Sequence, residues 1–489
     1  MRFFRGTKRL SAAAEPGGRK MRATAASLCG LSVVLSAVSV GAQNNQSSAT
    51  NAYYGSATIS AVTPNVIQLS LDDAIVRGLE HNLALELAKQ DQGAAHAQSL
   101  GELAPMLPAV DGTAAYGVHQ YNLAAEGFKP GLISGSPLAD LPLIQVVTVV
   151  QAQANYSQSL FDISQYMSYR SAQASEKAAF YNTQSSRGLV VLTVGTTYLR
   201  AVAAASEVEN ARALLRTDET LLYQAVEMHK AGVVANLDEL RARVTYQTQQ
   251  QALIAAENAF EKAKIDLNRE IGLPAAQKIA LSDAAPYQDL ASMTLEEARQ
   301  QAYVNRQDYQ SIQAQVKAAQ LNRKAAKYER MPTVSAGGNY GLTGVVGSTY
   351  HGTFAAVGTI NFPIFKEAKI RGDQHVAEAQ LNNTLAQMSD TRSKIDAQLR
   401  DSMLDVQAAQ ELVRVSRSNV ELATKTLEQV TDRFQAGIDD NLPVVTAQSS
   451  LAQAQNQLVA SLYKFNQAKL GLARNLGIID TQYKAYLGR

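Results

Sequence analysis

The chain has one cysteine and no tryptophan among 489 residues. Cys29 lies in an apolar run near the start and follows Leu28, which is too large for a lipoprotein cleavage site, so neither lipidation nor a disulfide is expected. The six histidines lack metal-ligating spacing, and phosphate loops, dinucleotide fingerprints and nucleophile elbows are missing. The net charge of +2, with both signs mixed along the chain, argues against nucleic acid. The sequence therefore predicts no enzyme, no cofactor and no metal site.

The start of the chain is typical of a secreted protein. An apolar run over residues 25–40 follows a basic residue and precedes small residues, so residues 1–42 are predicted to be a signal peptide that starts at Met1 or Met21. Residues 43–67 are rich in Ser, Asn and Ala and predict a flexible leader. No later segment offers 18 consecutive apolar residues, which excludes a later spanning helix on hydropathy. The mature chain is therefore expected to be soluble or to form a β-barrel.

The rest of the chain is an internal duplication. Residues 70–117 align without a gap with residues 294–341, and the segment Ala231–Leu237 aligns with Ala436–Leu442. A period of about 200 residues is too long for a solenoid repeat, so each copy is a domain-sized module. The predicted boundaries are repeat 1 at 68–272, an inter-repeat linker at 273–292, repeat 2 at 293–477 and a C-terminal tail at 478–489.

Each repeat is expected to run helix, strand, strand, helix. Ser70 with Asp73, and Thr294 with Glu297, have the spacing of a capping box, which marks a helix start in each copy. Alternating apolar and polar residues then predict two strands per repeat, at about 108–120, 144–158, 332–343 and 349–362. Such alternation suits a membrane barrel wall, with lipid on one side and water on the other, and equally a half-buried soluble sheet.

Long helices complete each repeat. The segment from Glu367 to about Gln435 has no proline and one glycine, which predicts a helix of roughly 100 Å. Apolar residues recur every seven positions from Leu399 to Phe434, beside small residues such as Ala409, as in a coiled-coil seam. Because the pattern resumes after a glycine turn, each repeat is predicted to end in a helical hairpin, with tips at about 231–237 and 436–442.

Four strands are too few to close a membrane barrel. Lipid tolerates no open sheet edge, and known barrels begin at about eight strands. Three copies would supply about twelve strands and would also gather the hairpins into a helical cylinder below the barrel. The predicted fold is therefore mostly α with a transmembrane β-barrel, which a homotrimer closes.

These features occur twice in the chain in the same order, and together they resemble the TolC family of outer-membrane efflux proteins, the outer membrane factors. The resemblance covers about residues 68–477 and rests on the helix starts at 70–74 and 294–298, the junctions at Pro108 and Pro332, and the Ala-Gly-Val/Ile tips. It implies a homotrimer in the outer membrane of a Gram-negative bacterium, with outer-membrane lipid around the barrel and a helical tunnel in the periplasm. It further implies a periplasmic adaptor (membrane fusion) protein and an inner-membrane pump of the RND or ABC type as partners, with passive conduction in efflux or type I secretion.

The resemblance also implies which residues meet the adaptor. They lie at the two tips: Gly232, Val233, Asn236, Leu237, Gly437, Ile438, Asn441 and Leu442. The nearby acids could form a ring that favours cations at the tunnel aperture, or could be helix N-terminal acids that complement the macrodipole; they are Asp238, Glu239, Asp439 and Asp440. Where a family member has an acidic pair that constricts the tunnel, this chain has Pro443 and Thr446. The alternative function is a soluble periplasmic coiled-coil scaffold or adaptor.

Overall fold

The computed structural model describes residues 51–127, 142, 144–283, 288–290, 293–436, 438 and 441–487. These residues belong to one compact unit, Gln46–Arg489. The predicted signal peptide with Cys29 lies outside the described residues, as do parts of the predicted leader, linker and C-terminal tail. Three of the predicted site residues also lie outside them: Gly437, Asp439 and Asp440.

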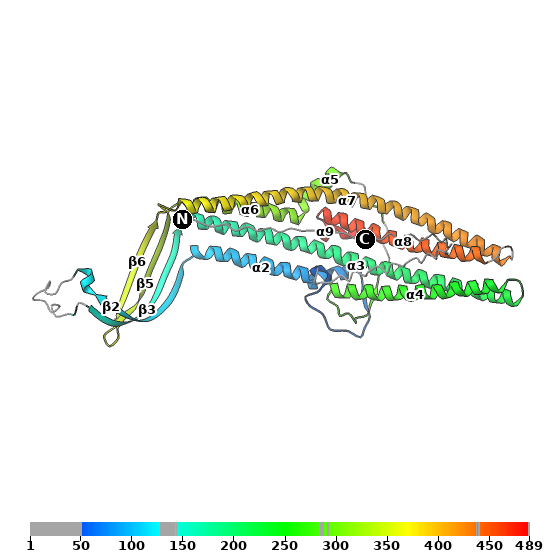
Figure 1. Cartoon of the computed structure of the whole chain (residues 1–489), viewed down its shortest axis with the longest axis horizontal. Coiled ribbons are helices and arrows are strands. Elements are labelled where there is room, and N and C mark those ends of the chain that lie inside the picture. Colours follow the sequence, from blue (N-terminus) through cyan, green and yellow to red (C-terminus); the bar gives the residue numbers. More distant parts are fainter. Residues whose placement is uncertain are drawn as a thin grey trace, which may run out of the picture. The chain divides into compact units, whose positions relative to one another are not determined.

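Both copies follow the predicted order of helix, strands and long helical hairpin. The elements of the first copy are η1 (Ala52–Tyr54), β1 (Ile67–Leu69), α1 (Leu71–His81), α2 (Leu83–Leu103), η2 (Ala104–Met106), β2 (Ala109–Asn122), η3 (Leu123–Glu126), β3 (Ile144–Phe161), α3 (Ile163–Lys230) and α4 (Asn236–Glu270). Those of the second copy are β4 (Ile279–Leu281), α5 (Leu295–Asn305), α6 (Gln307–Tyr328), β5 (Thr333–Val345), β6 (His351–Asn361), α7 (Glu367–Gln435), α8 (Leu442–Asn475) and α9 (Ile479–Leu487). Figure 1 shows the long strands at one end of the long helices.

The same local chemistry starts the helices of both copies. Ser70 Oγ accepts a hydrogen bond from the Asp73 N–H at 3.1 Å, and Thr294 Oγ1 accepts one from the Glu297 N–H at 3.3 Å, so both capping boxes form. Extended backbone then interrupts the helix at Asn82 in one copy and at the matching Arg306 in the other. Each copy therefore has a short helix, a break and a longer helix before its first long strand.

The four long strands form one antiparallel sheet in the order β2-β3-β5-β6. Tyr340 lies opposite Ala154 on one side and Phe354 on the other, whereas Asn155 lies opposite Asn339. Because successive residues of a strand point to opposite faces, the apolar positions in the middle of the sheet share one face and the polar positions share the other. The alternation breaks near the start of β3, where Val147 and Val149 lie on the face that carries Asn155.

The long helices form a wall in the order α4-α3-α8-α7, in which α3 and α8 join the two hairpins. The predicted seam is the contact of α7 with α8, where Leu399 and Val413 are fully buried. Ser416 Oγ lies 3.0 Å from Ser461 Oγ across this contact. Small residues at the seam allow the two helices to approach closely.

Helix α3 corrects one expectation from the sequence. It contains an 18-residue window that is long and apolar enough to cross a membrane, so the exclusion on hydropathy is wrong. Of this window, 61% is buried inside the structure. Val190, Val191, Val194 and Tyr198 belong to the apolar core there. The helix is apolar because other elements surround it, and isolated Thr and Arg residues hid this property from a search for uninterrupted runs.

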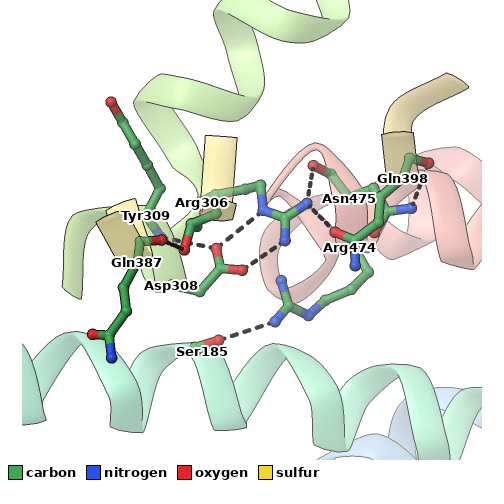
Figure 2. Close-up of polar contacts among 9 residues, drawn as sticks. Ser185, Arg306, Asp308, Tyr309, Gln387, Gln398, Arg474 and Asn475 are labelled. Carbon is green, nitrogen blue, oxygen red and sulfur yellow. Dashed lines mark hydrogen bonds and ion pairs between the residues drawn. The ribbon is translucent and has the colours of Figure 1, made fainter. Parts of the chain in front are cut away.

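A buried polar cluster joins four helices (Figure 2). Arg306, at the break before α6, donates to both carboxylate oxygens of Asp308 at 3.0 and 2.6 Å and to Gln398 of α7 at 2.9 Å. Arg474 of α8 donates to Ser185 of α3 at 3.0 Å. Burial acts to raise the pKa of Asp308, but the Arg306 guanidinium outweighs burial and lowers that pKa overall. Charge-assisted hydrogen bonds of this kind are among the strongest polar links in a protein.

Candidate functional site

Each hairpin tip begins with a helix C-terminal turn. After α3, Gly232 has φ +71°, and the Val233 N–H donates to Met228 O at 2.9 Å. This bond is the mark of a Schellman motif, which requires a left-handed residue that glycine adopts without strain. After α7, the Ile438 N–H donates to Arg433 O in the matching position at 3.0 Å. The long helices α3 and α7 therefore share this C-terminal hydrogen bond.

Both tips present large apolar side chains to solvent. Val233 and Leu237 are 62% and 54% exposed at the first tip, and Ile438 and Leu442 are 67% and 50% exposed at the second. Apolar side chains gathered at the end of a helical hairpin are typical of a surface that contacts another protein. Four of the predicted contact residues are thus placed where a partner could reach them.

The asparagines of the two tips differ. At the first tip, Asn236 and Gly232 are exposed. At the second, Asn441 is only 2% exposed, and its Nδ2 donates to Asp238 O at 3.3 Å. Asn441 therefore joins the two tips within one chain instead of presenting its side chain to solvent, and its predicted contact with an adaptor stays a prediction.

The two acids beside the first tip are paired with arginines. The Asp238 carboxylate is buried and lies 3.5 Å from the Arg241 guanidinium, and the Glu239 carboxylate lies 2.8 Å from that of Arg243. Both acids are in the first turn of α4, where the helix dipole stabilises negative charge. Of the two roles predicted for these acids, this geometry favours the helix N-terminal one.

A polar link between the hairpins was not foreseen from the sequence. Asp218 of α3 is 5% exposed, and its Oδ1 accepts a 2.6 Å hydrogen bond from Gln448 Nε2 of α8. Burial raises the pKa of Asp218 to about 6. Beside the link, Leu221, Phe434 and Val444 form a small apolar core that both hairpins share. The sequence did contain a signal for this buried acid. Asp218 lies three positions before Leu221, which is the spacing between neighbouring buried positions of a coiled-coil seam.

The buried polar clusters link helices to one another. Within the described ranges, no group of three or more His, Cys, Asp or Glu side chains is placed to hold a metal ion. The buried charges around Arg306 instead bond one another and neighbouring helices (Figure 2). The exposed tips and the exposed apolar face of the sheet are the surfaces that remain to be explained.

The chain is similar in sequence and in fold to known outer-membrane proteins. The family model described as outer membrane efflux protein matches residues 74–273 and 298–478. The chain is 26% identical over 416 residues to the pyoverdine export outer membrane protein OpmQ of Pseudomonas putida, across 82% of this chain and 84% of that protein. A membrane protein from Pseudomonas aeruginosa has a TM-score of 0.71 at 20% identity, across 83% of this chain and 93% of that one. The CmeC outer membrane channel of Campylobacter jejuni has a TM-score of 0.69 at 15% identity, across 84% and 86%.

The matched ranges contain all four long strands and both helical hairpins. The expected relationship to the outer membrane factors is therefore confirmed, and the sheet and hairpins take the places that barrel and tunnel occupy in that fold. This chain belongs to the outer membrane efflux protein family and is an outer-membrane efflux channel whose helices extend into the periplasm.

Proposed function

We propose that three copies of this chain form an exit duct, which passively conducts substrates that an adaptor and an inner-membrane pump deliver. The proposal rests on the two unpaired edge strands of the sheet. In the described sheet, β2 and β6 each pair with one neighbour only. An open edge in lipid leaves backbone N–H and C=O groups unsatisfied, at a cost of several kcal/mol each. Pairing β6 of one copy with β2 of the next removes both edges.

The exposed face of the sheet supports contact with lipid. Tyr116, Tyr340 and Phe354 are 73%, 73% and 81% exposed on the apolar face. A soluble scaffold would have to cover this face, whereas these three aromatic side chains are open to solvent. On the opposite face, Asn155 donates to Asp111 and Thr113, as expected for a water-filled interior.

The helical wall also ends in apolar edges. Exposed apolar residues lie at helical spacing on its two outer helices; they are Leu237, Leu240 and Val244 on α4, and Leu404, Val415 and Leu422 on α7. Because the two edges differ, contact between α4 of one copy and α7 of the next is heterologous and can close a ring. The predicted repeats, 68–272 and 293–477, would then be alternating sectors of that ring.

The partners are inferred from the relatives and from the tips. Relatives are named as outer membrane proteins of pyoverdine export and of a toluene efflux pump. We infer that this chain likewise works with a periplasmic adaptor, which contacts the exposed tip residues, and with an RND or ABC pump that selects the substrate. The duct itself would carry out no chemistry.

The test combines Val233→Asp with Ile438→Asp. Two charges in the apolar tip surface should abolish adaptor binding and export, while the mass of the detergent-purified assembly stays that of a trimer. The control is Ile59→Asp, which places a charge at another exposed apolar residue. Ile59 lies far from the tips, because the neighbouring Ser60 N–H donates to Gly272 O at the opposite end of α4. Normal export by the tip variant would reject the tips as the adaptor contact, and a monomeric mass for the unaltered protein would reject the ring.

A further inference from the structure

The junction between β6 and α7 has an amphipathic surface that conduction does not require. Phe362, Ile364 and Phe365 lie in this junction, and the last two are 91% and 100% exposed. Lys366 follows directly as the N-cap residue of α7 and is also exposed. Apolar side chains that enter the acyl region, next to cations that stay at headgroup level, are typical of a membrane-interface anchor.

The neighbouring helix ends carry a surplus of positive charge. Residues 323–330 and 366–373 contain seven lysines and arginines but three acids. Four of the cations reach carboxylates: Arg323 pairs with Glu378, Lys369 with Glu329 and Asp373, and Arg330 and Arg371 with Glu367. The other three, Lys324, Lys327 and Lys366, are exposed and pair with no carboxylate in the part of the chain that the structure describes.

The matching junction of the first copy lacks this charge. Residues 99–106 and 162–169 contain two acids, Glu102 and Asp162, and no lysine or arginine. Both copies nevertheless build the same helix-to-strand and strand-to-helix connections. The fold therefore does not require the basic residues, and their presence in one copy points to a ligand at that junction.

The surface also has a hollow in which a headgroup would fit. A cavity of about 210 Å³ lies between the strand ends and the helix ends, and its lining includes Lys366, Tyr328 and Thr333. Lys369, Glu329 and Asp162 line it as well, and Lys369 there is paired with Glu329 and with Asp373. Lys366, Tyr328 and Thr333 offer ammonium and hydroxyl donors, and Lys366 directly follows the exposed Phe365. Donors of this kind bind phosphate oxygens through charge-assisted hydrogen bonds. In Figure 1 the junction lies where β6 leads into α7, next to the end of α6.

We propose that this junction binds an anionic phospholipid of the periplasmic leaflet, with the headgroup at Lys366, the acyl chains along Ile364 and Phe365, and Lys324 and Lys327 adding positive charge on the adjoining end of α6. In the proposed ring the next copy lies along the edges of β6 and α7, close to this junction, and the experiment below separates that copy from a lipid. A lipid headgroup neutralises the same lysines while they remain in water. The proposal depends on the outer-membrane location but not on the adaptor or the pump.

The test measures lipid preference of the full-length protein. Native mass spectrometry compares retention of phosphatidylglycerol with that of phosphatidylcholine of equal chain length. Each lysine near an anionic surface changes affinity about fivefold. Combining Lys324→Gln, Lys327→Gln and Lys366→Gln should therefore lower the preference for phosphatidylglycerol at least about tenfold, whereas arginine at the same three positions should retain it.

The control removes equal charge elsewhere, through Lys230→Gln, Lys394→Gln and Lys425→Gln on the hairpins. This control should keep the preference for phosphatidylglycerol, as should the tip variants that abolish export. An unchanged preference in the junction variant, or an equal loss in the control, would overturn the proposal. Loss of trimer mass in the junction variant, with the lipid preference intact, would assign the surface to a second copy.

Discussion

The buried bond between Asp218 and Gln448 makes the contact between the hairpins sensitive to pH. Burial disfavours the carboxylate, so the pKa of Asp218 is about 6 instead of 3.8. A carboxyl group whose pKa is raised by folding stabilises the folded state fully below about pH 3.8, and this stabilisation is lost as pH rises through about 6. The difference of about two pH units corresponds to about 3 kcal/mol.

Asp218→Asn tests this reasoning because it keeps the acceptor oxygen for Gln448 and removes the ionisation. The variant should stabilise the α3–α8 contact by up to about 3 kcal/mol at pH 8 and have little effect at pH 4. The assay is hydrogen–deuterium exchange of the full-length protein, read at amides around Asp218 and Gln448 and corrected for intrinsic rates. At pH 8, exchange should slow by up to about 100-fold.

Two further variants make this result decisive. Asp218→Ala leaves Gln448 Nε2 without its acceptor, so it should weaken protection at pH 4 by about 1–3 kcal/mol. At pH 8 the variant also removes the buried charge, which offsets this loss. Asp401→Asn changes an exposed acid of α7 and should leave the exchange protection around Asp218 and Gln448 unchanged at pH 4 and at pH 8. Equal protection of the unaltered protein and Asp218→Asn at pH 8 would refute the view that a buried charge loosens this contact.

Two other predictions concern the interior of the helical wall. Glu270 is buried and its pKa is raised to about 8, mainly by burial, so stability should fall as pH rises from about 4.5 to about 8, with a slope of up to about 1.4 kcal/mol per pH unit. Glu270→Gln can keep the hydrogen bond from Thr197 Oγ1 and should remove that slope in thermal melts; equal slopes would contradict the assignment. Ser416→Leu should force α7 from α8 where Ser416 meets Ser461, costing about 1–3 kcal/mol. Ser416→Ala should be near neutral, and equal thermal midpoints for both variants would rule out close packing there.

The fold can be predicted from the sequence because the features that determine it are local. Capping boxes at Ser70 and Thr294 mark the helix starts, and alternation marks the four strands. The seven-residue seam from Leu399 onward identifies α7 as one side of a hairpin. Duplication strengthens each of these signals, because the matching breaks at Asn82 and Arg306 occur at equivalent positions.

The site is less predictable because it depends on neighbours far away in the sequence. Asn236 and Asn441 have similar local sequences, yet one is exposed and the other is buried against the first tip. Asp218 and Gln448 are 230 residues apart and meet only because α3 packs on α8. Periodicity shows which face of a helix is buried but not which helix covers it.

The position of the buried cluster around Arg306 along α3 has a mechanical consequence if the helix tilts there. Arg474 fastens to α3 at Ser185, 22 residues after the start of that helix and 45 before its end. At 1.5 Å per residue, the two arms of α3 are roughly 33 and 68 Å long. If the cluster acts as a fulcrum, a tilt of α3 moves the tips about twice as far as the strand end. A displacement small enough for a closed barrel to tolerate is thereby doubled where the duct would open.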